Sequence, residues 1–257
     1  MTFMPQVREV YTFLDEWAPF ATQLAMDNAG LLIGSETAEV VGITVCFDIT
    51  ADVVRQAAAA GHSLLVSHHP VIFHPLRRVE GESIPYLLAA AGMSAICAHT
   101  NLDAAEGGVN DVLAAALDLR EVFPLPGEDG APPMARIGRL SRPMPAAGFA
   151  AYVKEKLGCG GVRYTDIPRE IQRVAVLGGS GADMLQTAAA AGADALVTGE
   201  ARHHELLLAR TLGVSLIDGG HFCTEQKIVA ELCARLSAAF PGLPVAAAQE
   251  AEPAKYI

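Results

Sequence analysis

The chain has 257 residues, of which 51% are hydrophobic, and its formal net charge at pH 7 is −11. The apolar content argues against disorder, and the excess of negative charge disfavours bulk binding to nucleic acid or anionic lipid. No uncharged apolar run approaches the roughly 18 residues of a membrane-spanning helix, so no membrane association is expected. Residues 1–5 show no signal-peptide pattern, and the five cysteines form no Cys-x-x-Cys pair. We therefore expect a cytoplasmic protein with reduced thiols.

The first half of the chain alternates short apolar runs with helical patterns. The run at Val40–Phe47 is apolar and β-branched, as in a buried strand, and the next helical pattern stops at Gly61, a natural C-terminal cap. In chain order we expect a helix at Val7–Trp17, a strand at Val40–Phe47, a helix at Ala51–Ala60, a strand at Leu64–Val66, a helix at Ile84–Ala91 and a strand at Ser94–Ala98.

The chain then repeats this pattern. Val40–Ser67 aligns with Ile171–Thr198 without a gap, and Ala57–Gly61 falls opposite Ala188–Gly192. Alanine bias inflates the match, but both segments keep the order strand, helix, glycine, strand. We infer an internal duplication in which each copy is a βαβ unit, which implies an α/β fold with mostly parallel sheets flanked by helices.

The division of the chain follows from the segment between the copies. Phe123–Pro133 is rich in proline, glycine and acidic residues, as linkers are. We expect a first α/β half at 1–124 and a second at 125–257, with a C-terminal helix that can pack back on the first half. In the second half the pattern predicts a strand at Ala135–Leu140, a helix at Ala146–Leu157 and a strand at Val162–Thr165; the tail after Pro241 has no assignment.

Imidazoles and carboxylates gather in three clusters, each where an apolar run ends. The clusters are Ser67–Pro70, His99–Asp103 and Asp218–Glu225. Open α/β sheets bind ligands at the carboxyl ends of their strands, and this set of side chains suits Zn²⁺, Fe or Mn²⁺. The first interpretation is a metalloprotein whose site uses residues from both halves.

Seven ordered motifs resemble those of the GTP cyclohydrolase type 2 homologue family, also called Nif-three-like proteins. The resemblance runs from about residue 5 to about residue 240. Ala29 departs from the family, which often has Val there. The motifs are Asp27–Leu31, Ser67–Pro70, His99–Asp103, Gly107–Asp111, Gly178–Gly181, Thr198–Glu200 and Asp218–Glu225.

The resemblance implies two interlinked α/β domains that face a cleft holding two divalent metal ions, whose identity among Zn, Fe and Mn it leaves open. It also implies a homohexamer. An extra domain that some members insert between the halves is not expected here, because the connector is short. By resemblance the metal ligands are His68, His69, Asp103, His221 and Glu225.

Several of these residues could instead have a purely structural role. His68 and His69 would point to opposite faces of a regular strand, although a strand end before Pro70 can aim both inward. Asp103 can bridge two cations or cap a helix ahead of Gly107 and Gly108. His99 is open between a metal ligand, a donor that orients a ligand and a residue without a role.

In the second half, His221 and Glu225 lie four residues apart, so a helix would place both on one face, as ligands of one cation or as a surface ion pair near Lys227. His203 and His204 follow Thr198–Glu200, in the region of the repeat that corresponds to His68 and His69.

His203 and His204 are candidate proton carriers together with His99, or they lie on a surface helix without a catalytic role. The glycine-rich segment Gly178–Gly181 can cradle a phosphate on its N–H groups or form a plain tight turn, which is the preferred interpretation.

Two functions fit these observations. The first is a metal-dependent hydrolase acting on a small molecule such as a nucleotide, the activity that the family label implies. Arg77, Arg78 and Arg202 would then add positive potential near the motifs. The second is a non-catalytic metal-binding, regulatory or scaffold protein.

Overall fold

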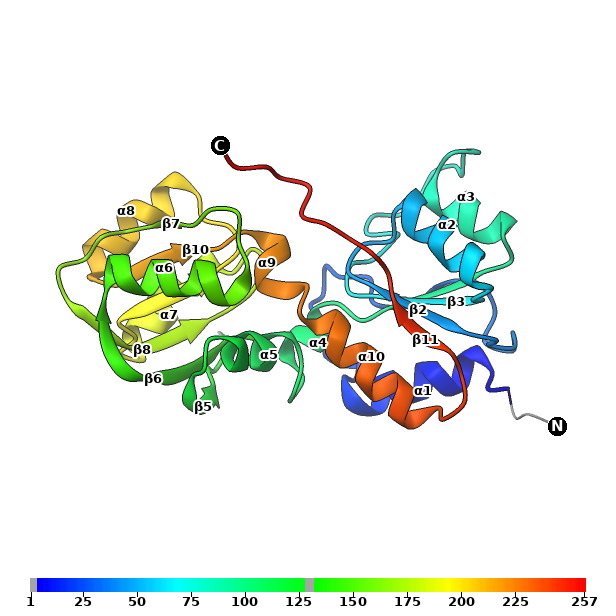
Figure 1. The fold of residues 1–257 in the computed structure, drawn as a ribbon, viewed down its shortest axis with the longest axis horizontal. Helices are drawn as coiled ribbons and strands as arrows, with labels where there is room; N and C mark the ends of the chain where they lie inside the picture. The colour runs from blue at the N-terminus through cyan, green and yellow to red at the C-terminus, as the bar shows by residue number, and fades with distance from the viewer. Residues whose placement is uncertain (1–3, 128–131) are drawn as a thin grey trace. The chain divides into compact units, whose positions relative to one another are not determined.

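The computed structural model describes residues 4–127 and 132–257, and it divides the chain into two compact units (Figure 1). The first unit contains Met1–Glu106 and Ile228–Ala251, and the second contains Gly107–Lys227 and Glu252–Ile257. Residues 107–124 thus group with the second unit and residues 228–251 with the first, whereas the sequence placed the halves at 1–124 and 125–257. Residues 128–131 of the expected linker lie outside the described residues. None of the described helices is long and apolar enough to cross a membrane.

The first unit is built on a five-stranded sheet with the order β1-β4-β3-β2-β11. Only β1 is antiparallel to its neighbour, so this sheet is mostly parallel, as predicted. Its elements are α1 (Val7–Trp17), η1 (Phe20–Thr22), β1 (Gly30–Ile33), β2 (Ile43–Cys46), α2 (Ala51–Ala60), β3 (Leu64–Ser67), α3 (Ile84–Ala90), β4 (Ser94–Cys97), α4 (Thr100–Ala104), α10 (Ile228–Ala239) and β11 (Val245–Ala247).

Local sequence explains the helices of this unit. The Thr50 side chain accepts a hydrogen bond from the backbone N–H of Val53 at the start of α2, and Gly61 ends that helix in the left-handed conformation. Helices α2 and α3 cover one face of the sheet (Figure 1), and the core on that face joins Val53 of α2, Leu88 of α3 and Leu65 of β3.

The second unit is built on a six-stranded sheet with the order β5-β6-β8-β9-β10-β7. Its centre, β8-β9-β10, is parallel, and the outer pairings are antiparallel. The sheet is therefore mixed rather than mostly parallel, because β6 joins it antiparallel to β8. Its elements are α5 (Val109–Ala116), β5 (Arg120–Pro124), β6 (Arg136–Pro145), α6 (Ala146–Leu157), β7 (Arg163–Tyr164), β8 (Glu170–Val176), η3 (Ala182–Met184), α7 (Leu185–Ala190), β9 (Ala195–Thr198), α8 (His203–Leu212), β10 (Ser215–Asp218) and α9 (His221–Glu225).

Helices cover both faces of this second sheet. Phe149 of α6 and Leu113 of α5 belong to one core with alternate residues of β8, and Leu185 of α7 and Ala209 of α8 belong to the other. Buried side chains thus alternate between the two faces of β8, as a strand covered on both sides requires.

The internal repeat has the predicted local structure in both copies. In the first, β2 and β3 flank α2 and are parallel. In the second, β8 and β9 flank η3 and α7 and are also parallel. Both copies therefore deliver the residues after their second strand to the carboxyl edge of a parallel sheet, where ligand sites of α/β proteins form.

Candidate metal centre

Three imidazoles of the first unit come together at the carboxyl ends of two parallel strands. His68 and His69 follow β3, and His99 follows its neighbour β4. One ring nitrogen of each lies within 4.8 Å of the others. The centroids of the His68 and His69 rings are 5.0 Å apart, and those of His68 and His99 are 5.3 Å apart. His68 and His69 therefore do not point to opposite sides after β3.

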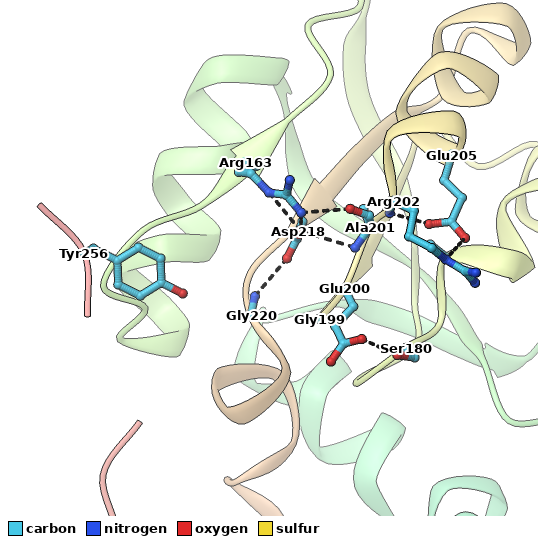
Figure 2. A pocket seen from close by; sticks show the side chains of 11 residues that line it. Arg163, Ser180, Gly199, Glu200, Ala201, Arg202, Glu205, Asp218, Gly220 and Tyr256 are labelled. Atoms are coloured by element: carbon cyan, nitrogen blue, oxygen red, sulfur yellow. Dashed lines mark hydrogen bonds and ion pairs between the residues drawn. The ribbon is translucent and has the colours of Figure 1, made fainter. Parts of the chain in front are cut away.

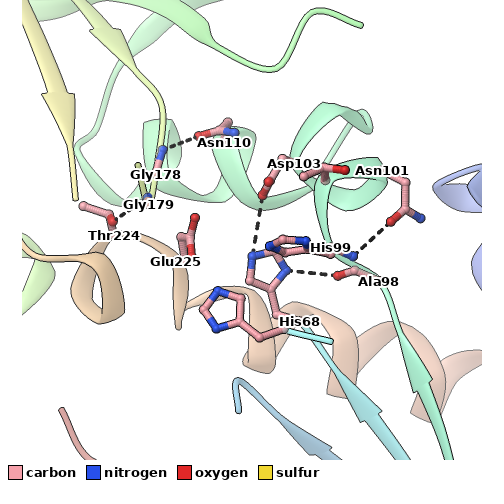
Figure 3. Close-up of polar contacts among 12 residues, drawn as sticks. His68, Ala98, His99, Asn101, Asp103, Asn110, Gly178, Gly179, Thr224 and Glu225 are labelled. Carbon is pink, nitrogen blue, oxygen red and sulfur yellow. Dashed lines mark hydrogen bonds and ion pairs between the residues drawn. The ribbon is translucent and has the colours of Figure 1, made fainter. Parts of the chain in front are cut away.

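The orientation of all three rings is set in the same way, by an oxygen that accepts a hydrogen bond from Nδ1. Carbonyl and ionised carboxylate oxygens can only accept, so Nδ1 carries the proton and Nε2 carries the lone pair of each neutral ring. The contacts are His68 to the Ala98 carbonyl at 3.0 Å, visible in Figure 3, His69 to Asp48 at 2.8 Å, and His99 to Asp27 at 2.7 Å.

Asp103 adds a carboxylate to this cluster. It lies inside α4, is buried, and places Oδ1 3.6 Å from Nε2 of His68 (Figure 3). The helix that begins after Gly107 has Gly108 at its N-cap, so Asp103 does not cap it. Three imidazoles and one carboxylate form a nitrogen and oxygen donor set that fits Zn²⁺, Fe²⁺ or Mn²⁺.

Asp27, which lies shortly before β1, holds the His99 imidazole by a hydrogen bond. Burial raises the pKa of the Asp27 carboxyl, but hydrogen bonds from His99 and Thr100 outweigh it and hold that pKa well below its usual value. Asp27 accepts from Nδ1 of His99, and its other oxygen accepts from both the backbone and the hydroxyl of Thr100. The carboxylate therefore joins the His99 loop to the segment before β1.

We expect Asp27→Asn to lower the free energy of unfolding at pH 7 by about 1.5–3 kcal/mol, the range for hydrogen bonds to a charged group. A depressed folded-state pKa gives stability above the unfolded value of about 3.9, and this stability is lost as pH falls through the lower folded value. The difference between wild type and variant should therefore shrink below about pH 4. Urea unfolding from pH 3 to 7 measures it, and a constant difference across that range would contradict the charge argument.

The second unit carries its own pair of candidate ligands on α9. Nε2 of His221 lies 3.0 Å from Oε2 of Glu225, and Nδ1 donates to Glu200 at 2.7 Å. The hydrogen bond from the Ser180 hydroxyl and then that from His221 hold the pKa of Glu200 below its usual value. Because Glu225 is buried, its contact with His221 is not the exposed ion pair of a helix surface, and Glu200 contacts the other nitrogen of the His221 ring.

The glycine-rich segment after β8 makes room for this pair. A Cβ on Gly179 would lie 2.3 Å from Oε1 of Glu225 and 3.1 Å from Nε2 of His221, and one on Gly178 would lie 2.7 Å from Cγ of Glu225. Gly179 also has φ +58°, a conformation that favours glycine. Two glycines in sequence are thus needed for Glu225 to reach its position.

Three amides of the same segment donate to side chains of the unit. The N–H of Gly178 donates to Asn110 at 2.8 Å, as Figure 3 shows, and that of Gly179 donates to Thr224 at 3.2 Å. The N–H of Gly181 donates to Thr198 at 3.0 Å. These three contacts support the preferred interpretation as a tight turn, and the turn contacts α9, the helix of His221 and Glu225.

A polar cavity of about 600 Å³ opens next to Glu200 within the second unit (Figure 2). Its charged walls are ion pairs: Arg163 contacts Asp218, and Arg202 lies 3.4 Å from Glu205. The full lining comprises Arg163, Ser180, Ala182, Gly199, Glu200, Ala201, Arg202, Glu205, Asp218, Gly220 and Tyr256.

Tyr256, near the end of the chain, closes one side of this cavity. Its ring lies so close to Gly160 and Gly161 that a Cβ on either would fall 2.2 Å and 2.5 Å from ring carbons. Burial and a hydrogen bond to Glu252 raise the pKa of Tyr256 to about 12, so the phenol stays protonated near neutral pH.

The remaining sequence candidates lie at the surface. His203 and His204 are exposed in the first turn of α8, where Arg202 and Glu205 line the cavity. Arg77 and Arg78 lie on the exposed segment between β3 and α3, and Arg78 pairs with Glu80.

Sequence reasoning gave no role to Asp27, Asp48 or Glu200. Asp48 is the second residue after β2, so the rule that ligands gather at strand ends could have found it. Asp27 and Glu200 belong to ordered motifs of the chain, but nothing local predicts that their carboxylates meet His99 and His221.

The chain is similar to known proteins along most of its length. A family model described as Duf34/NIF3 (NGG1p interacting factor 3) matches residues 5–253. A Streptomyces coelicolor protein named GTP cyclohydrolase 1 type 2 homolog is 33% identical over 86% of this chain and 82% of its own length. A Helicobacter pylori protein named GTP cyclohydrolase 1 type 2 is 31% identical over 89% of this chain and 92% of its own length.

Solved structures show the same fold. A Staphylococcus aureus hypothetical protein superposes with a TM-score of 0.91 and 28% identity, covering 99% of this chain and all of that one. Since the family model spans nearly the whole sequence, the chain belongs to the Duf34/NIF3 family.

Proposed function

We propose that this protein is a metal-dependent hydrolase of a nucleotide or related small molecule, with two divalent ions held by His68, His69, Asp103, His221 and Glu225. The observation that carries the proposal is the imidazole cluster of the first unit, whose three rings are all oriented through Nδ1 by oxygen acceptors. Orientation of this kind is the usual support of metal-binding histidines.

Two divalent ions would lower the pKa of a bound water and stabilise charge on the substrate. His99 supplies the third nitrogen of the first-unit cluster. It would either bind an ion or carry a proton. Glu200 keeps the Nδ1 proton of His221, so that ring would also present Nε2 to an ion. We also propose that the protein is cytoplasmic and forms a homohexamer.

The cavity beside Glu200 supports a small polar substrate. Arg163 and Arg202 line it but are paired with Asp218 and Glu205, so the positive charge for an anionic substrate would come mainly from the metal ions. Glu200 lies on the wall that leads to His221. The names of the Streptomyces and Helicobacter relatives point to a guanine nucleotide as the first compound to test.

The deciding experiment is turnover by metal-loaded protein. Purified protein reconstituted with Zn²⁺, Mn²⁺ or Fe²⁺ should hydrolyse at least one member of a panel of nucleotides, phosphodiesters and cyclic amides. His69→Ala and Asp103→Ala should each lower kcat/KM at least about 100-fold, as loss of a metal or its activated water does, while His74→Ala should leave it unchanged. Tight metal binding without turnover on the panel would instead favour a regulatory or scaffold protein.

A further inference from the structure

A row of three arginines crosses the sheet of the second unit. Arg139 of β6 lies opposite Arg120 of β5 in register, and on its other side it lies opposite Arg173 of β8. Directly opposed residues share a face of the sheet, and like charges in such positions destabilise it. All three side chains are exposed, and none forms a salt bridge with any residue that the structure describes. Their one hydrogen bond to a side chain is from Arg139 to Gln172 at 3.3 Å.

A β-bulge brings an aromatic ring to the same face. Arg120 pairs with Arg139 and Phe123 pairs with Ile137, so β5 uses three residue steps where β6 uses two. Glu121 occupies the bulge with φ +51°, which is unfavourable for a residue other than glycine. Since Ile137 and Arg139 are two residues apart, Phe123 faces the same side as the arginines, and 62% of it is exposed.

A neighbouring glycine accommodates the bulge. A Cβ on Gly138 would lie 3.0 Å from the carbonyl oxygen of Arg120 and 3.1 Å from the Val122 side chain. The result is a hollow of about 130 Å³ lined by Glu121, Phe123, Ile137, Gly138, Arg139 and Arg173. Two arginines of the row and the exposed ring therefore border one concave site.

We propose that the row of Arg120, Arg139 and Arg173 binds a chain of linked phosphates, either free polyphosphate or the triphosphate of a nucleotide. Three neighbouring strands span two inter-strand spacings, about 10 Å, so a linear anion can meet all three guanidinium groups and a single phosphate cannot. Arginine forks match phosphate oxygens, and a bound polyanion relieves the repulsion within the row. The site uses no proposed metal ligand and does not rest on the proposed function.

The test is calorimetric titration of inorganic tripolyphosphate into the full chain, in buffer with a chelator so that no metal ion contributes. Arg139→Gln with Arg173→Gln should weaken binding at least about 30-fold and reduce the slope of log Kd against log salt by about 2, one for each lost phosphate contact. Arg142→Gln, on the same strand but outside the row, is the matched control and should change Kd less than about 2-fold. Glu121→Gln should tighten binding, because it removes the carboxylate that borders the hollow.

Further titrations distinguish free polyphosphate from the triphosphate of a nucleotide as the ligand. Equal binding of tripolyphosphate and adenosine triphosphate identifies the phosphate chain alone as the ligand. Tighter binding of the nucleotide that is lost in Phe123→Ala identifies a nucleotide whose base contacts the ring. Orthophosphate should bind at least about 10-fold more weakly than either, since it meets fewer arginines.

The double variant should melt no lower than wild type, because it removes like charges from adjacent strands. Two binding results overturn the proposal: wild type does not bind tripolyphosphate at millimolar concentration, or Arg142→Gln weakens binding as much as the double variant does. A third overturning result is that the double variant differs from wild type in its mass by sedimentation but not in its Kd for tripolyphosphate. The last would make the row an interface between copies of the chain.

Discussion

Replacing His69 with alanine should remove at least one of the two proposed metal ions, so that dialysed variant protein contains less metal than dialysed wild type. His69 is the second residue after β3, its side chain is only partly exposed, and its Nδ1 donates a hydrogen bond to Asp48. Loss of the imidazole removes one of the three ring nitrogens that lie within 4.8 Å of one another. We expect metal affinity to fall at least about 100-fold, beyond the 10–100-fold typical of losing a residue that only supports a ligand.

Elemental analysis of dialysed protein measures this loss, together with competition titration against a chromogenic chelator. His74→Ala is the matched control, because it deletes an exposed imidazole of the same unit. An unchanged metal content in His69→Ala, with the control also unchanged, would show that the imidazole cluster is not a metal site.

The same titration assigns His99. If its Nε2 binds an ion, His99→Ala should lose metal as completely as His69→Ala. If it only orients its neighbours or carries protons, metal content should stay near that of wild type and kcat should fall instead.

Much of this site could be predicted because its signals are local. Helix α2 ends at Gly61 where the sequence predicted, and β3 then delivers His68 and His69 to the edge of the sheet. Parallel pairing of β3 with β4 brings His99 to that edge, which follows from the strand order alone. The ends of α1, α2 and α6 coincide with the predicted ones, since helical periodicity and caps are short-range features.

What could not be predicted depends on long-range pairing. β11 joins the first sheet beside β2, although nearly 200 positions separate them in the sequence, and its three residues carry too weak a pattern to assign. Strand β6 continues to Pro145, past the expected end at Leu140, because the pairing with β8 resumes after an irregularity. The contacts of Asp27 with His99 and of Glu200 with His221 likewise require the folded sheet.

Gly179→Ala should destabilise the second unit and weaken metal binding together. The added methyl group would meet Oε1 of Glu225 at 2.3 Å, and alanine is unfavourable at φ +58°. The backbone contribution is about 1–2 kcal/mol and overpacking adds about 1–3 kcal/mol, so the free energy of unfolding should fall by about 2–5 kcal/mol.

Gly213→Ala separates these two contributions. Gly213 ends α8 with φ +69°, and a Cβ there would have no heavy atom within 4 Å. It should therefore cost only the backbone share and leave metal affinity unchanged. Urea unfolding and chelator competition on both variants measure the two effects. If Gly179→Ala matched Gly213→Ala in stability and kept wild-type metal affinity, the glycine pair would not be what positions Glu225, and the role of α9 as a ligand-bearing helix would lose its structural support.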